Sequence, residues 1–143
     1  MNSDWPKRIF IAASKHFQDA ADNYPITLFI EGTDYTPQAK YLEFRLDGPI
    51  IKQYNNDYHE LDYMIEILWS LIMTHDDFHE TQKLIGMITE AMTDICVYNE
   101  DSSFLGTLVL QNPIKTANFG QVDTKTSVMQ GTVFGDYKIC LTP

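Results

Sequence analysis

Two histidines four residues apart are the first candidate for chemistry in this sequence. His75 and His79 flank Asp76 and Asp77, and imidazole and carboxylate groups together can bind zinc when they share one helix face. The same residues also predict a helix start, because Asp77 followed by Glu80 forms a capping box. A helix that begins at Asp77 leaves His75 outside it. The acidic residues then complement the helix dipole, and the pattern favours a cap over a metal site.

A second candidate is an acidic cluster. Asp57, Glu60, Asp62 and Glu66 fall within ten residues, and paired carboxylates can do acid–base or metal-assisted chemistry when burial separates their pKa values. Glu60, Asp62 and Glu66 have the same parity, so on a strand they share one face, opposite an apolar row. The pattern favours a solvated face, or a charged surface inside an assembly.

Other signals of catalysis are weak or absent in the sequence. Ser14, His16 and Asp19 share a helix face by spacing alone. The sequence contains no G-x-S-x-G motif, no phosphate-binding loop and no dinucleotide fingerprint. We therefore expect no catalytic residues, no metal and no cofactor.

Composition predicts one acidic domain over residues 1–143. The chain is 44% hydrophobic and 13% aromatic, with 20 acidic and 10 basic residues and a net charge of −10. This apolar content is enough for a core. The charge repels nucleic-acid phosphate and anionic membranes, so neither sequence-specific nucleic-acid binding nor a membrane partner is expected. Cys96 and Cys140 lie between apolar neighbours, which predicts two buried thiols and not a zinc site.

Helical spacing indicates two main helices. The first is expected over about 4–22, with apolar residues at three- and four-residue steps and Tyr24-Pro25 as its stop. The second is expected over about 77–93. Gly86 lies in its interior, where glycine costs about 1 kcal/mol relative to alanine, and we expect close packing against a sheet there.

Strands are predicted at 26–30, 41–46, 50–54, 95–98, 104–110 and 127–141, with Asp47-Gly48-Pro49 breaking or bending the second. The stretch from Leu61 to Met73 is apolar at every odd position, although Leu61, Met64, Ile65, Leu68 and Ile72 also fit helical spacing. Its aromatic and β-branched content favours a strand that leads directly into the second helix. The element order predicts an α+β fold, a mixed or antiparallel sheet flanked by two helices.

The segment 111–126 is long for a loop in a compact domain. Ile114, Phe119 and Val122 are apolar residues in an otherwise polar run. An extended arm that docks on a neighbouring subunit and a plain loop both fit this pattern.

With its elements in this order, the chain resembles the tail-terminator proteins of long-tailed bacteriophages and related neck or minor tail proteins. The similarity lies in the amphipathic N-terminal helix, Leu28-Phe29-Ile30-Glu31-Gly32 with the loop to Pro37, the strand 41–46, the long strand 61–73 with the helix from 77, and the closing strand 131–137. It supports the strand interpretation of 61–73 and covers nearly the whole chain.

The resemblance implies a structural virion protein. Such subunits form a homo-oligomeric ring, usually a hexamer, that caps the tail tube and connects it to the head. The implied partners are the tail tube protein and the head-completion or neck protein, and DNA passes through the lumen without sequence-specific binding. An acidic chain suits such a lumen. The family brings no catalytic residues, and the implied location is the tail or neck of the virion.

Six residues are candidates for interfaces on physical grounds. They are Phe119 and Val122 on the arm, Tyr35 on the loop before Pro37, and the charged row Glu60, Asp62 and Glu66. We expect the apolar row of 61–73 to hold the second helix and the charged row to face water or the ring. The alternatives are a head-completion or neck adaptor, a tail-tube subunit, and more remotely a metal-dependent enzyme or an acidic adaptor that mimics nucleic acid.

Overall fold

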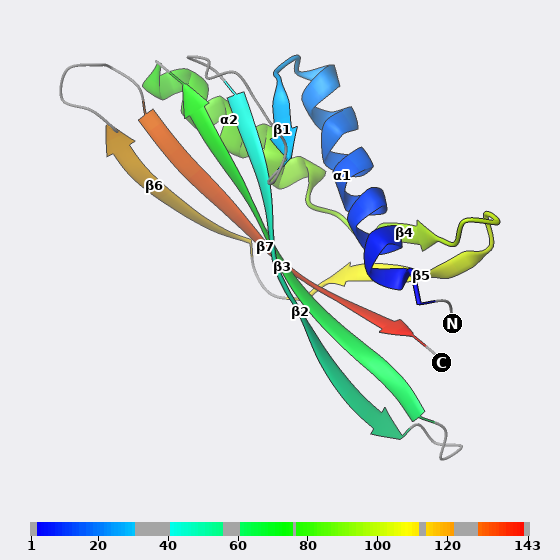
Figure 1. Ribbon diagram of the computed structural model, residues 1–143. Helices are drawn as coiled ribbons and strands as arrows, with labels where there is room; N and C mark the ends of the chain where they lie inside the picture. Colours follow the sequence, from blue (N-terminus) through cyan, green and yellow to red (C-terminus); the bar gives the residue numbers. More distant parts are fainter. Residues whose placement is uncertain are drawn as a thin grey trace.

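The computed structural model describes residues 3–30, 41–55, 61–75, 77–111, 114–121 and 129–141. These residues form two helices and seven strands in an α+β fold, which confirms the predicted class (Figure 1). In chain order the elements are α1 (Trp5–Asn23), β1 (Leu28–Ile30), β2 (Tyr41–Asn55), β3 (Leu61–His75), α2 (Phe78–Ala91), β4 (Ile95–Tyr98), β5 (Phe104–Leu110), β6 (Lys115–Gln121) and β7 (Met129–Leu141).

The sheet is mixed. Its strand order is β1-β2-β3-β7-β5-β4, and β6 pairs with β7 away from this path. β1 is parallel to β2, and the other pairs are antiparallel. One edge of β7 follows β3 along its whole length, while its other edge is divided between β5 and β6. β3 and β7 therefore form the centre of the sheet.

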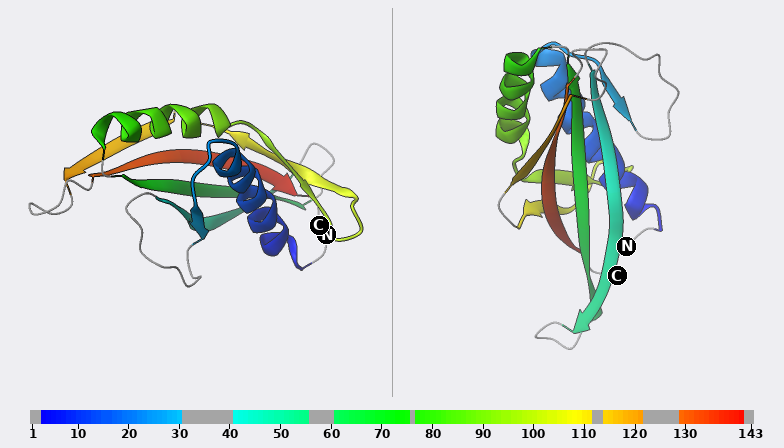
Figure 2. Two further views of the ribbon diagram at one scale, coloured as in Figure 1. Left: turned by 90° about the horizontal axis from the view of Figure 1, so that it is seen from above. Right: turned by 90° about the vertical axis from the view of Figure 1, so that its left-hand side faces the viewer.

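Strand β3 confirms the interpretation of the alternating stretch. From Ile65 to Met73 its odd-numbered residues are all at most 2% exposed. Both helices cover this face: α2 packs on β3 and β7, and α1 packs on β1, β2 and β4. In the right-hand view of Figure 2, α1 lies behind β3 and β2. The apolar row of β3 thus holds α2 as expected.

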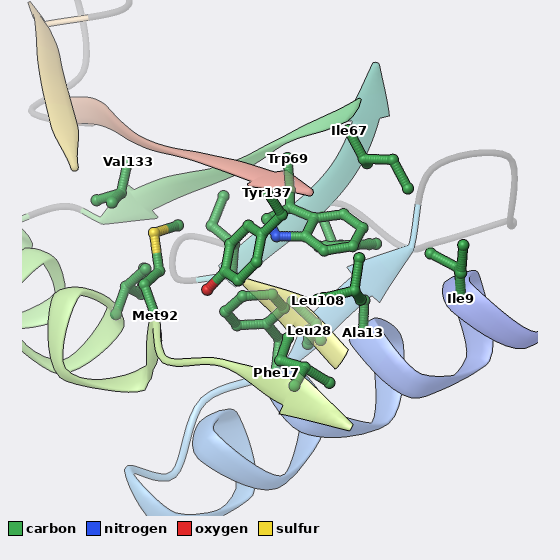
Figure 3. Packing of buried hydrophobic residues seen from close by; sticks show 14 of the residues in the cluster. Ile9, Ala13, Phe17, Leu28, Ile67, Trp69, Met92, Leu108, Val133 and Tyr137 are labelled. Atoms are coloured by element: carbon green, nitrogen blue, oxygen red, sulfur yellow. The ribbon is translucent and has the colours of Figure 1, made fainter. Parts of the chain in front are cut away.

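The core under the helices is built around aromatic rings (Figure 3). Trp69 on β3 is fully buried, and its ring centroid lies 5.2 Å from that of Tyr137, 5.7 Å from that of Phe44 and 6.4 Å from that of Phe17. The hydroxyl of Tyr137 donates a hydrogen bond to the Thr93 carbonyl at 2.9 Å. Burial, together with the charge of nearby Asp94, raises the pKa of Tyr137 to about 12.

Helix α1 follows the predicted pattern. Ile9, Ala13, Phe17 and Ala21, spaced four residues apart, are almost completely buried, as one face of an amphipathic helix requires. The helix ends at Asn23, directly before the Tyr24-Pro25 stop that proline chemistry predicts.

Helix α2 begins where the capping residue predicts. The Asp77 side chain accepts hydrogen bonds from the backbone N–H groups of His79 at 2.8 Å and Glu80 at 3.3 Å. The helix ends at Ala91, two residues before the predicted end at 93. Met92 leaves the helical region with ψ of 77°, and an added Cβ at Gly135 would lie 3.0 Å from its sulfur. Packing of Met92 against the sheet therefore accompanies the early end.

The Asp47-Gly48-Pro49 segment bends a strand without ending it. β2 continues from Tyr41 to Asn55, and its pairing with β3 shifts register between Asp47 and Ile50. Gly48 has φ of +106°, a value that favours glycine. The segment is a β-bulge that separates the covered first half of β2 from its second half.

The prediction for the segment 111–126 is corrected by the structure. Lys115–Gln121 form β6, which pairs antiparallel with Phe134–Met129 of β7, so the expectation of a plain loop is wrong for these residues. Backbone hydrogen bonds to a long neighbouring strand organise a sequence that has little apolar alternation of its own. Residues 122–128 lie outside the described part of the chain.

The prediction that both cysteine thiols are buried was also wrong, because Cys96 and Cys140 are free and exposed. On β4 the buried residues are Ile95 and Val97, and Cys96 has the opposite parity. Cys140 likewise alternates with the buried residues Ile139 and Leu141. Apolar neighbours in sequence therefore point away from each cysteine, to the other face of the strand.

Gly86 gives a test of helix energetics. The expected close packing was wrong: an added Cβ at Gly86 would meet nothing within 4 Å. We predict that Gly86→Ala raises the free energy of unfolding by about 0.5–1 kcal/mol, because alanine loses less backbone entropy on folding. Urea unfolding at one fixed protein concentration measures the change.

The matched control is Gly135→Ala. There the new Cβ would lie 3.0 Å from Met92 Sδ and 3.0 Å from Tyr137 Cε2, so we expect destabilisation by about 1–3 kcal/mol from overpacking. A Gly86→Ala variant that unfolds at a lower urea concentration than the wild type would contradict the assignment of Gly86 to an open helix face.

Candidate interaction surface

The most distinctive surface is the far half of the β2–β3 hairpin. Beyond the bulge, Ile50–Asn55 pair with Glu66–Leu61 of β3, whereas β1 pairs with β2 at Leu42–Phe44. Within the described part of the chain, no strand pairs with the outer edge of Ile50–Asn55. The hairpin extends past both helices (Figure 1).

Two adjacent isoleucines are exposed on this edge. Ile50 is 58% exposed and Ile51 is 50% exposed, and adjacent residues of a strand point to opposite faces. On the helix-covered face, Ile51 is paired with Ile65, which is paired with Ile139, and those two neighbours are 0% and 1% exposed. Beyond the bulge the helix cover therefore stops between β3 and β2, which leaves Ile51 in contact with water, while Ile50 is exposed on the opposite, uncovered face of the sheet.

The opposite face of the sheet carries an ion-pair cluster. Glu66 Oε1 lies 3.0 Å from Lys52 Nζ and 3.8 Å from Lys138 Nζ. The hydrogen bond from Lys52 is the main reason why the pKa of Glu66 lies below its ordinary value of 4.5. Glu66 thus faces away from the helices, as its parity predicts, and two lysines neutralise it.

A hollow lies at the bulge, and Ile50 is part of its lining. It has a volume of about 300 Å³ and is lined by Asp47, Gly48, Ile50, Glu66, Ile67, Leu68 and Asp136. Carboxylates and aliphatic groups line it together, without a His or Cys. A hollow of this kind suits a contacting side chain better than a reaction centre.

A second cleft, of about 370 Å³, lies between α1 and β4 and includes His16 and Cys96. His16 Nε2 is hydrogen-bonded to the Ala91 carbonyl at 2.6 Å, and the Ser14 hydroxyl donates a hydrogen bond to the Phe10 carbonyl at 2.7 Å. Ser14, His16 and Asp19 therefore do not form the hydrogen-bonded relay that nucleophilic catalysis uses.

The histidine pair serves the helix start. His75 is 7% exposed, and its Nδ1 accepts a hydrogen bond from the Asp77 backbone N–H at 2.9 Å. His79 lies in the first turn of α2, outside the strand that carries His75. Among the described residues, no three His, Cys, Asp or Glu side chains are placed to hold a metal ion.

The sequence-predicted interface residues are distributed unevenly. Tyr35, Glu60 and Val122 lie outside the described residues. Asp62 and Phe119 have described backbones, in β3 and β6, but their side chains do not belong to the described part. Glu66 lies close to the hairpin edge. The two isoleucines were missed, although one signal was present: two successive apolar residues directly after Gly48-Pro49 cannot both face one core.

Comparison with known proteins adds the fold alone. No family model matches the chain, and no curated protein matches it. A solved structure whose name describes no activity is similar, with a TM-score of 0.58 and 17% identity over 96% of this chain and 97% of that one. None of the described helices is long and apolar enough to cross a membrane.

The ion-pair cluster gives a pH prediction. Because the pKa of Glu66 is lowered in the folded chain, its contribution to stability is present above the unfolded-state pKa and is lost as the pH falls through the folded-state value. We expect Glu66→Gln to be less stable than wild type near pH 7, and the difference to vanish in acid. The effect is small because the site is exposed.

Urea unfolding of both proteins between pH 3 and pH 7 measures this difference. Lys52→Met is the control background, since it removes the hydrogen bond that lowers the pKa most, and in it Glu66→Gln should matter less. Parallel stability profiles for wild type and Glu66→Gln across the whole range would refute the role of the ion pairs.

Proposed function

We propose that this chain is a structural subunit of the tail-terminator type, which assembles into a ring that caps the tail tube of a tailed bacteriophage and connects it to the head. The observation that carries the proposal is the projecting hairpin edge with Ile50 and Ile51 exposed on opposite faces. Its proposed partners are further copies of itself in a hexamer, the tail tube protein and the neck protein.

The exposed edge supports an assembly role for an energetic reason. Burying a fully exposed isoleucine side chain yields about 1.5–3 kcal/mol. Because Ile50 and Ile51 are each about half exposed in a single copy, about half of this stabilisation remains to be gained at each position when a partner covers it. An unpaired strand edge is also a template for another chain. A second copy that covers the edge satisfies both requirements.

The element order supports the specific class. The amphipathic helix α1, the short β1, the long β2–β3 hairpin and the helix directly after β3 follow the order on which the resemblance to tail terminators rests. The charge of −10 suits a ring through which DNA must pass without being held. The described clefts offer no arrangement of nucleophile and base that would favour an enzyme instead.

Sedimentation velocity of the purified protein, with electron microscopy, tests the proposal. We expect a closed ring with about six times the chain mass of 16.5 kDa, and antibody labelling of virions at the junction of head and tail. A strictly monomeric protein that is absent from particles would overturn it.

Salt dependence separates this function from that of an acidic adaptor. An assembly of acidic subunits through apolar contacts should persist, or strengthen slightly, as salt screens the repulsion between copies. An acidic adaptor on a basic partner should instead dissociate. Measuring the ring fraction between 50 mM and 500 mM NaCl distinguishes the two, and loss of the ring at high salt would count against the proposed contacts.

A further inference from the structure

We propose that neighbouring copies join by extending the sheet: the outer edge of β6 in one copy pairs antiparallel with Ile50–Asn55 of β2 in the next. This inference rests on the proposed ring, and it names the two surfaces that meet. The occupant of the exposed hairpin edge is therefore a second copy of this chain.

Both surfaces are strand edges without a partner among the described residues. β6 pairs with β7 on one side, and Ile50–Asn55 pair with β3 on one side. The two segments, of seven and six residues, differ in length by one residue. Such edges present rows of backbone N–H and C=O groups that an added strand can satisfy.

Strand directions make the contact antiparallel. β2, β3, β7 and β6 are successive antiparallel neighbours, so β6 runs opposite to β2. When the next copy continues the sheet in the same orientation, its β6 lies antiparallel beside β2. The two edges differ, so the contact is head-to-tail, the kind that generates rings when its rotation closes.

The two edges also lie at opposite ends of the strands. β6 pairs with the Met129–Phe134 part of β7, which lies opposite Ser70–His75 of β3, whereas Ile50–Asn55 lie opposite Leu61–Glu66. Joining them shifts each copy along the strand direction. A stagger of this kind is what a sheet needs in order to close on itself.

The charge distribution favours a second copy as the occupant. The chain carries 20 acidic residues, yet neither 50–55 nor 115–121 contains an Asp or Glu. Each segment has one lysine, and Lys52 is already paired with Glu66 at 3.0 Å. Two acidic copies can therefore meet at these edges without opposing carboxylates, whereas a basic partner would gain more from a carboxylate-rich surface.

Disulfide trapping tests the contact in the full chain. The background is Cys96→Ser with Cys140→Ser, because both native thiols are exposed. Two double-cysteine proteins are made in this background. One carries Ile51→Cys with Thr116→Cys, and the other carries Gln53→Cys with Thr116→Cys, which samples the neighbouring register on the same face. Three strand spacings of about 4.8 Å separate β2 from β6, so the paired cysteines are too far apart to bridge within one chain.

We expect one of the double-cysteine proteins to give a ladder of covalent oligomers on a non-reducing gel after oxidation, ending at the ring. Each single-cysteine protein should stay at the chain mass. A dimer from Ile51→Cys alone would mean that two β2 edges meet, which overturns the inference. Rings of the background protein without a ladder from either pair also overturn it, while the proposed function stands. A background protein that is monomeric would contradict both this inference and the proposed function.

A non-covalent test uses Ile50→Asp, which should weaken association by at least about tenfold, because it places a charge where the proposed contact would bury an exposed isoleucine. The matched control is Ile11→Asp on α1, at a residue that is 41% exposed and lies away from both edges. Circular dichroism confirms that both variants fold. Equal weakening by the two substitutions would contradict the assignment of the contact to the hairpin edge.

Discussion

Burial of Trp69 is the constraint on which the rest of the structure depends. Its position at the middle of β3 requires a cover on one face of the sheet, and α1 supplies it through Phe17. The register places Gly135 directly opposite Trp69 on β7, where a Cβ would lie 3.3 Å from the Trp69 ring. A missing side chain on one strand thus makes room for the largest side chain on the next, and this fixes both the helix and the register.

The uncovered hairpin follows from the same packing. α1 lies over the aromatic centre, and α2 lies over the end of β3 and β7 where Gly131 approaches Thr81. The two helices therefore cover the middle and one end of the sheet. The row Ile139, Ile65 and Ile51 passes from 1% and 0% exposure to 50% within three neighbouring strands. The exposed edge is the part of the sheet that the helix cover does not reach.

Much of this fold follows from local sequence patterns, and the rest depends on contacts between distant segments. The alternation of 61–73 and the capping residue Asp77 act locally, so both were predictable. β6 was not, because the backbone of β7, distant in sequence, holds it in place. The cysteines were placed on the wrong face because apolar neighbours reveal a strand and not which of its faces is buried. Residues 50–54 were predicted as a strand, but the exposure of Ile51 on the face that the helices cover elsewhere depends on where the helices end, which the local sequence does not show.

The hairpin edge also limits how another strand can pair with it. Natural sheets protect their edges with bulges, prolines and lysines, and β2 has all three: a bulge after Asp47, Pro49 without an N–H, and Lys52. The bulge and Pro49 interrupt regular pairing at residues 48 and 49. Lys52 is drawn to Glu66 at 3.0 Å on the face opposite the helices, so its charge is partly neutralised. The bulge and the proline both precede Ile50, so residues 50–55 can accept a short strand while a longer one is excluded. Such a restriction suits a subunit that must pair with one neighbour in one register and must not aggregate.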